Sequence, residues 1–201
     1  MSLQSPATPI GAGFARPVWD SQAVFRHVLE AMAHPGRVTH LPVAPEAPAG
    51  FHPATAAACL TLLDYETRVW LQAGPGEAEA RTYLRFHCGC PFAASEAEGD
   101  FALILAPGAA PPLDAFSPGL AEQPHRSATA VLQVQDLHRG PLVRLRGPGI
   151  AEVHDLRVAG LPRDFWAQWR VNGALFPLGV DVILTCRDEV AALPRTVQAE
   201  T

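Results

Sequence analysis

Hydrophobic positions near the start of the chain follow the spacing of an amphipathic helix. From residue 24 to residue 32, apolar side chains fall at i, i+1, i+4, i+5 and i+8, so they form one stripe. Asp20 or Ser21 can cap the N-terminus of this helix, and His34-Pro35-Gly36 ends it. The stripe consists of Val24, Phe25, Val28, Leu29 and Met32.

Helical and strand-like patterns then alternate along the chain. Further helices are expected at 53–63, at 77–87 and from about 162 to 174. Strands are expected at 37–41, 67–71, 101–105, 130–134, 142–145, 150–153 and 180–184. The chain is then expected to leave as a tail through Leu193, Pro194 and Arg195. Because helices alternate with strands early and strands cluster late, the sequence predicts an α/β fold with a mixed β-sheet flanked by helices.

Length and composition indicate one domain. The chain has 201 residues, of which 48% are hydrophobic and 17% charged, and this is enough for a sizeable core. No repeat, linker or domain boundary is evident. We expect a single domain over residues 1–201, with residues 1–13 forming a flexible N-terminal arm.

The charged residues exclude several classes of function. The 20 acidic and 15 basic residues give a net charge of −5, which argues against a nucleic-acid partner. All the basic residues are arginine, because the sequence contains no lysine. A lysine Schiff base, a Walker-type phosphate lysine and a lysine general base are therefore excluded. An anion in this protein would be held by guanidinium groups.

The sequence also indicates the cellular compartment in which the protein works. The longest uncharged stretch, residues 47–63, contains Pro48, Gly50 and Pro53, so no membrane span is predicted. The opening residues lack a positively charged start followed by an apolar run, which argues against a secretory signal. Four cysteines are too few to form a disulfide scaffold in a chain of 201 residues. We expect a reduced, soluble, cytoplasmic protein.

One short cluster resembles half of a metal site. His87, Cys88 and Cys90 have ligand-like chemistry, but structural zinc usually takes two such pairs, and the chain has no second pair. The lone Cys59 and Cys186 fit small core residues. We predict neither a metal nor a cofactor.

Four candidate polar residues have a plain structural alternative. Asp64 follows a predicted helix and could belong to an acid–base pair, but a turn that binds local amides is favoured. Arg26 could hold an anion or pair with Glu30, and Arg85 could hold an anion or lie on a solvated face. His87 shares a helix face with apolar residues, which favours a hydrogen-bonded core histidine.

Two candidates lie near the end of the chain. Asp181 interrupts an apolar strand, and an acid there must be paired or hydrogen-bonded. Arg195 follows Pro194 in extended backbone and could hold an anion or contact a partner. The sequence contains no HExxH or GxSxG motif, and no catalytic constellation emerges from the residues alone.

Short blocks in a fixed order resemble a known family, the PhnH-type subunit of bacterial carbon–phosphorus lyase. They span about Phe14 to Thr196, although Cys88 and Cys90 depart from the family pattern. The family's motifs coincide with Asp20, Arg26, Asp64, Arg85, His87, Asp181 and Arg195, which are candidate polar or anion-binding positions, and no catalytic assignment is carried over to them. The blocks include Pro17-Val18-Trp19-Asp20-Ser21-Gln22, Ala31-Met32-Ala33-His34-Pro35-Gly36, Leu84-Arg85-Phe86-His87, Phe176-Pro177-Leu178-Gly179-Val180-Asp181 and Leu193-Pro194-Arg195-Thr196.

The resemblance implies a role in phosphonate catabolism. It implies a core assembly with G-, I- and J-type subunits that forms alpha-D-ribose 1-methylphosphonate 5-triphosphate from ATP and methylphosphonate. It also implies a fold similar to the large domain of pyridoxal-phosphate-dependent transferases, without the cofactor or its lysine, and a homodimer when isolated. We expect a structural or ligand-cleft subunit. The alternatives are a stand-alone enzyme acting on phosphorylated metabolites, with Arg26, Arg85 or Arg195 gripping the anion, and a pure scaffold protein.

Overall fold

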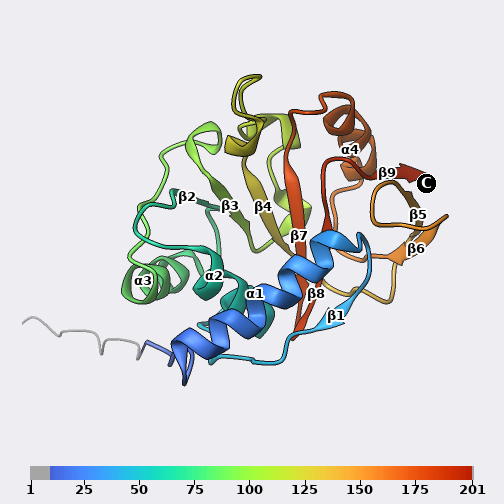
Figure 1. Ribbon diagram of the computed structural model, residues 1–201. Coiled ribbons are helices and arrows are strands. Elements are labelled where there is room, and N and C mark those ends of the chain that lie inside the picture. Colours follow the sequence, from blue (N-terminus) through green and yellow to red (C-terminus); the bar gives the residue numbers. More distant parts are fainter. Residues whose placement is uncertain (1–9, 201) are drawn as a thin grey trace, which may run out of the picture.

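A mixed six-stranded sheet forms the centre of the computed structural model, which describes residues 10–200 (Figure 1). Its strands are β1 (Thr39–His40), β2 (Val69–Leu71), β3 (Phe101–Ile104), β4 (Thr129–Gln133), β7 (Asp181–Cys186) and β8 (Glu189–Leu193). They are ordered β1-β8-β7-β4-β3-β2, with β2, β3, β4 and β7 parallel and β8 antiparallel to β7 and β1. A smaller antiparallel sheet has the order β6-β5-β9, with β5 (Leu142–Arg146), β6 (His154–Arg157) and β9 (Gln198–Glu200).

Four α-helices and the smaller sheet cover the two faces of the main sheet (Figure 1). Neighbouring side chains of β4 show the two layers, because Val131 packs with α1, α2 and α3 whereas Leu132 packs with α4 and the smaller sheet. The predicted α/β fold with a mixed sheet and flanking helices is therefore confirmed. The helices are α1 (Pro17–Ala33), α2 (Pro53–Leu62), α3 (Glu77–His87) and α4 (Phe165–Ala174).

The predicted strand at 150–153 is wrong. These residues form bends after a turn at 147–149, and β6 begins only at His154. Gly149 has φ of +82°, so the chain turns sharply there before it can pair with β5. Ile150 packs on the core from this loop and Val153 is 39% exposed, so the apolar residues of the segment do not belong to a buried strand.

The expected tail is also wrong, because the chain continues into two more strands. β8 is buried throughout and pairs with both β7 and β1, and β9 joins the smaller sheet. The turn between β7 and β8 is Arg187-Asp188, with Arg187 at φ of 52°. Hairpin turns of this kind usually carry glycine or asparagine, so this turn has no recognisable sequence signature.

The start of α1 also differs from the prediction. The helix begins at Pro17, whose fixed φ suits the first helical position, and not at Asp20 or Ser21. Asp20 lies one turn into the helix, and its carboxylate accepts a hydrogen bond from the backbone N–H of Arg16 at 2.8 Å. Asp20 therefore stabilises the start of the helix from inside its first turn. A carboxylate at this position also interacts favourably with the positive end of the helix dipole.

The expected N-terminal arm falls partly outside the structure, since residues 1–9 are not among the described residues. The remainder, residues 10–13, contacts the body of the protein. The backbone N–H of Ala12 donates to Glu46 at 3.1 Å, and the carbonyl oxygen of Gly11 accepts from His87 Nε2 at 2.9 Å. This part of the arm is therefore attached to the folded core.

The turn at 147–149 packs so closely on the end of α1 that Gly149 tolerates no side chain. An added Cβ would lie 2.1 Å from the carbonyl oxygen of Ala33 and 2.9 Å from Pro35 Cδ. We predict that Gly149→Ala lowers the free energy of unfolding by about 2–4 kcal/mol in urea denaturation. Gly108→Ala is the control, because its Cβ meets no atom within 4 Å. Equal stability of the two variants would contradict this prediction.

Candidate functional site

Asp181 and Arg195 form a charged pair at the amino end of β7. The carboxylate of Asp181 accepts from the backbone N–H of Arg195 at 2.7 Å, from Nε at 3.1 Å and also from Nη2. Their side chains are only 16% and 13% exposed. The expectation that the acid on this strand must be paired is therefore correct, and its partner is Arg195.

The remaining donors of Arg195 contact two loops. Nη1 donates to the carbonyl oxygens of Pro124 at 3.1 Å and Pro177 at 3.4 Å, and Nη2 also donates to the hydroxyl of Ser127. All five N–H groups of the guanidinium are thus engaged within the protein. Arg195 has no donor left for an anion, so its role here is to hold loops and strands together.

Two further candidates lie on α1. Asp20 is buried and bound to Arg16. Arg26 is exposed, and Glu30 pairs with His34 and Arg37 rather than with Arg26. Among residues 10–200, Arg26 has no ion pair, so of its two alternatives the pairing with Glu30 is not observed.

Asp64 closes the turn that follows α2. Its Oδ1 accepts from the backbone N–H groups of Glu66 at 2.9 Å and Thr67 at 3.0 Å, and from the Thr67 hydroxyl at 2.7 Å. The Thr67 hydroxyl and these amides lower the pKa of Asp64, because they stabilise its charged form. The turn interpretation is supported over an acid–base pair with Glu66.

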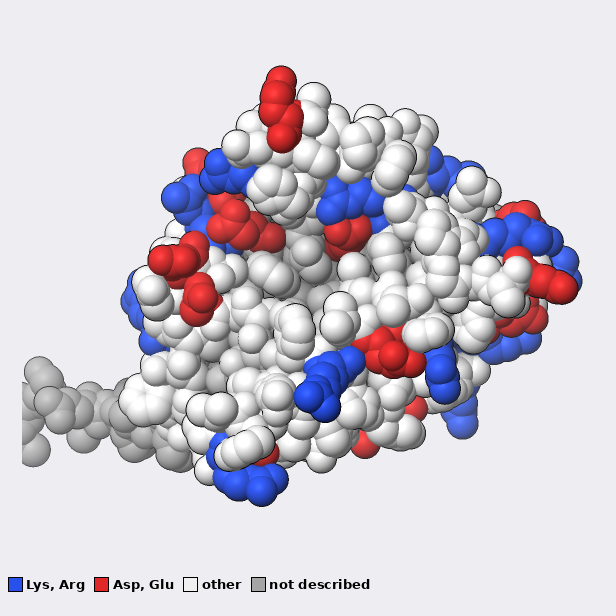
Figure 2. Space-filling view, viewed as in Figure 1, with Lys and Arg blue, Asp and Glu red and all other residues white. Residues whose placement is uncertain are grey.

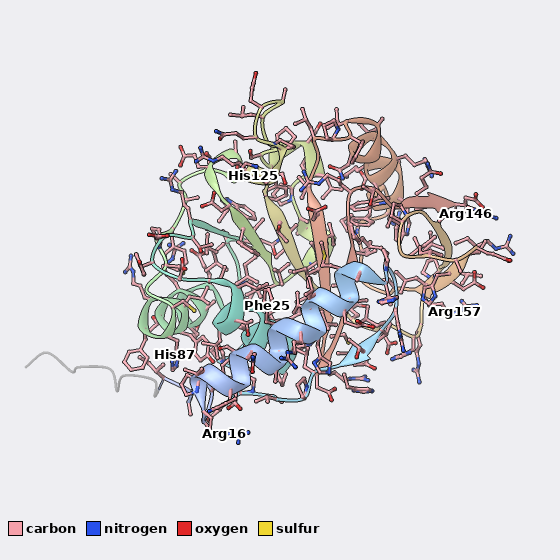
Figure 3. All side chains as sticks on the ribbon, viewed as in Figure 1. Arg16, Phe25, His87, His125, Arg146 and Arg157 are labelled. Carbon is pink, nitrogen blue, oxygen red and sulfur yellow. The ribbon has the colours of Figure 1, made fainter. Side chains whose placement is uncertain are left out.

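Arg85 and His87 lie near the C-terminal end of α3. Arg85 is exposed, with its guanidinium carbon 5.8 Å from the ring centre of Phe92. The ring of His87 packs at a tilt against Tyr83, with the ring centres 4.5 Å apart, and its Nε2 donates to the carbonyl oxygen of Gly11. His87 therefore fastens the chain that leads into α1 (Figure 3). The contacts of both residues are with other parts of this chain. Among the described residues, Asp181 and Arg195 are the only two of the seven candidates whose side chains bond to each other.

The apolar stripe predicted on α1 divides between the core and the surface. Val24 and Val28 are buried against the sheet, as the spacing predicts. Phe25 and Leu29, one residue further along in each turn, are 48% and 57% exposed. The stripe is wider than the contact that α1 makes with its own core.

Four large apolar side chains are exposed along α1. Val18 is 79% exposed and Trp19 is 67% exposed, and both lie about two turns before Phe25 and about three turns before Leu29. We call these four residues the α1 face. Figure 3 labels Phe25 midway along the helix, and the surface over α1 is largely uncharged, with isolated charged groups on it (Figure 2). Clustered large apolar side chains on a surface mark an interaction site.

The cysteines of the supposed half zinc site face inwards. Burial is the main cause that raises the pKa of Cys59, Cys88 and Cys90, and neighbouring thiols raise it further at Cys59 and Cys88. Cys88 contacts the carbonyl oxygen of Cys59, with its sulfur 3.7 Å away. Within residues 10–200, no three His, Cys, Asp or Glu side chains are grouped so that they could hold a metal ion.

Fold and site together describe an α/β protein with an exposed apolar helix face, in which the seven candidate residues do not converge on one catalytic centre. Residues 12–200 match the family described as bacterial phosphonate metabolism protein (PhnH), and the chain belongs to this family. No helix in residues 10–200 combines the length and apolar content that a membrane crossing requires.

Two relatives align over most of their length. The alpha-D-ribose 1-methylphosphonate 5-triphosphate synthase subunit PhnH of Rhizobium meliloti (strain 1021) is 38% identical over 187 residues, which covers 93% of this chain and 94% of the relative. A protein named as a candidate C-P lyase subunit, HtxG of Stutzerimonas stutzeri, is 36% identical over 187 residues, which covers 89% of this chain and 87% of the relative.

The Asp181–Arg195 pair gives a stability prediction. Asp181→Asn leaves the Arg195 charge largely buried without its counter-ion, and we expect a loss of about 3 kcal/mol in urea denaturation. The control is Glu200→Gln, because the pair of Glu200 with Arg146 is about half exposed on both sides and contributes less than about 1 kcal/mol. If the two variants lose equal stability, the pair does not hold this end of the sheet.

The cysteines give a reactivity prediction. Burial, together with Cys90 and Asp64, raises the pKa of Cys88 to about 12, so about one thiol in ten thousand is ionised at pH 8. We expect iodoacetamide to label Cys88 of the folded protein at least about 100-fold more slowly than in 6 M urea, measured by peptide mass spectrometry. Fast labelling in the folded protein would show that the thiol is activated.

Proposed function

We propose that this chain is a structural subunit of a carbon–phosphorus lyase assembly. In this proposal it takes part in forming alpha-D-ribose 1-methylphosphonate 5-triphosphate from ATP and methylphosphonate. The family membership and the two nearly full-length relatives, both named as subunits, support it. The partners are the G-, I- and J-type subunits that the family resemblance implies.

The observation that carries the subunit role is the α1 face. Trp19 is 67% exposed and Val18 is 79% exposed, and leaving such large apolar side chains in water is unfavourable for a chain that works alone. Tryptophan and arginine are enriched among the residues that contribute most to binding at protein interfaces. We place the contact with another subunit of the assembly on this helix.

The residues on and beside the α1 face indicate what kind of partner surface binds there. Arg26 lies next to Phe25, is exposed and has no ion pair within residues 10–200. A docking partner therefore presents an apolar patch to Trp19 and Leu29 and a carboxylate to Arg26, whose planar guanidinium binds a carboxylate through two hydrogen bonds. The occupant in this proposal is a different subunit, and a homodimer through α1 is an outcome that the experiment below detects.

The further expectations about this subunit are part of the proposal. The four cysteines are all free thiols, which suits a reducing compartment, and we propose the cytoplasm. The fold is proposed to be related to the large domain of pyridoxal-phosphate-dependent transferases. Without a lysine the chain offers no side-chain amine for an internal aldimine, so a catalytic use of that cofactor is not proposed.

A stand-alone enzyme on phosphorylated metabolites is the second candidate. It requires Arg26, Arg85 or Arg195 to grip an anion beside a proton-transfer group such as His87 or Asp64. Arg195 is fully engaged, and the hydrogen bonds of His87 and Asp64 hold a chain segment and a turn. Turnover of ATP with methylphosphonate by the purified chain alone would favour this candidate, and turnover only after partner subunits are added would favour the first.

The subunit role predicts the effect of a double substitution on the α1 face. Trp19→Ser with Leu29→Ser removes two exposed apolar contacts, so the stability of the isolated chain changes by less than about 1 kcal/mol. We expect the affinity for the co-expressed G-, I- and J-type subunits to fall at least about 10-fold, measured by pull-down and interferometry.

The matched control is Val171→Ser on α4, where Val171 is 63% exposed. It is expected to leave binding unchanged. A wild-type chain that always elutes without the other subunits would contradict the subunit role. Loss of binding in the α4 variant alone would contradict the assignment to α1, and loss of a homodimer in the α1 variant would show that a second copy occupies the face.

A further inference from the structure

A cleft opens at the edge of the main sheet where the parallel strands end. Residues that follow β3 and β4 line it, together with His52 and the pair Gly160-Leu161, and its volume is about 740 Å³. In open α/β sheets, ligands bind in the crevice outside the carboxyl ends of the strands. The cleft lies away from the α1 face, because α1 contributes no residue to its lining.

The lining of the cleft carries no permanent charge. Its walls consist of apolar residues such as Leu105, Pro107 and Leu161, with His52, Gln133 and Gln135 as the polar side chains, and no arginine or carboxylate among them. A phosphate or a carboxylate would find no counter-ion there, so the cleft suits an uncharged ligand.

His52 presents a hydrogen-bond donor of fixed position. Its Nδ1 accepts a hydrogen bond from the backbone N–H of Arg187 at 3.0 Å, so the ring proton is on Nε2. Burial, and then the charge of Arg187, lower the pKa of His52, which keeps the ring neutral at pH 7. Within residues 10–200, Nε2 has no hydrogen-bond partner.

Two buried glutamines hold the walls in place. Gln72 accepts from the N–H of Ala106 at 2.9 Å and donates to the carbonyl oxygens of Ala106 and Ala109 at 3.1 Å each. Gln133 accepts from the backbone N–H of His52 and donates to another backbone carbonyl at 2.7 Å. Because its walls are fixed, the cleft is formed before any ligand arrives, and binding costs little ordering entropy.

We propose that this cleft binds a nucleobase. The base offers ring-nitrogen acceptors to His52 Nε2–H, both donors and acceptors to the exposed amide of Gln135, and apolar faces to the partly exposed Leu105 and Leu161. A sugar would leave most hydroxyls unpaired against these walls, and an aliphatic ligand would leave His52 unpaired. The site goes beyond the docking role, and it is independent of the α1 face.

Adenosine is the probe, titrated into the purified full-length chain by calorimetry. We expect binding with a sub-millimolar dissociation constant, and no binding of inorganic triphosphate. Gly108 lines the cleft and its added Cβ would meet no atom within 4 Å, so Gly108→Trp can fill the cleft and is expected to abolish binding. Gly108→Ala is the matched control and is expected to bind as the wild type does.

A second variant tests the proposed donor. His52→Asn keeps an acceptor for the Arg187 N–H but removes Nε2–H, and we expect adenosine binding to weaken about 10-fold. Adenosine should also shift the backbone amide NMR signals of Ala106 and Gln135, a readout that needs no variant. Unchanged binding in both cleft variants, amide shifts confined to other parts of the chain, or competition by inorganic triphosphate would overturn the proposal. These outcomes leave subunit binding untouched, whereas loss of subunit binding in the α1 variant leaves adenosine binding untouched.

Discussion

The guanidinium of Arg195 fixes one end of the main sheet. It joins the first residue of β7, Asp181, to the segment after β8 and to the loops around Ser127 and Pro177. Only a planar fork with five donors can satisfy so many acceptors in one plane, and lysine cannot replace it. The arginine-only composition of this chain therefore has a structural use as well as an implication for anions.

The first helix, α1, takes part in two surfaces. One side of the helix packs Val24 and Val28 against the sheet, and the rest of its surface leaves Trp19 and Leu29 in solvent. An isolated monomer gains nothing from such exposure, whereas a subunit buries the same surface when it assembles. The helix is thus both a part of the core and the proposed contact with a partner.

The sequence predicted the candidate site only where a residue was out of place in its local pattern. Asp181 interrupts an apolar strand, so its need for a partner was visible, but Arg195 lies 14 positions away and could not be named as that partner. Asp64 was predictable as a turn residue because its partners are its neighbours. His52 gave no signal, since its surroundings come from Arg187 and Gln133, which are distant in the sequence.

Local patterns in the sequence determined the helices at 53–62 and 77–87 and the buried parallel strands, because hydrophobic spacing and capping act over a few residues. Tertiary structure alone decided that the segment after Arg187 is an interior strand, since its turn carries no glycine and its alanine-rich residues favour a strand only when they are paired on both sides. It also decided which part of the α1 stripe is buried. Spacing defines how wide an apolar stripe is, but only the packed neighbours define how much of it they cover.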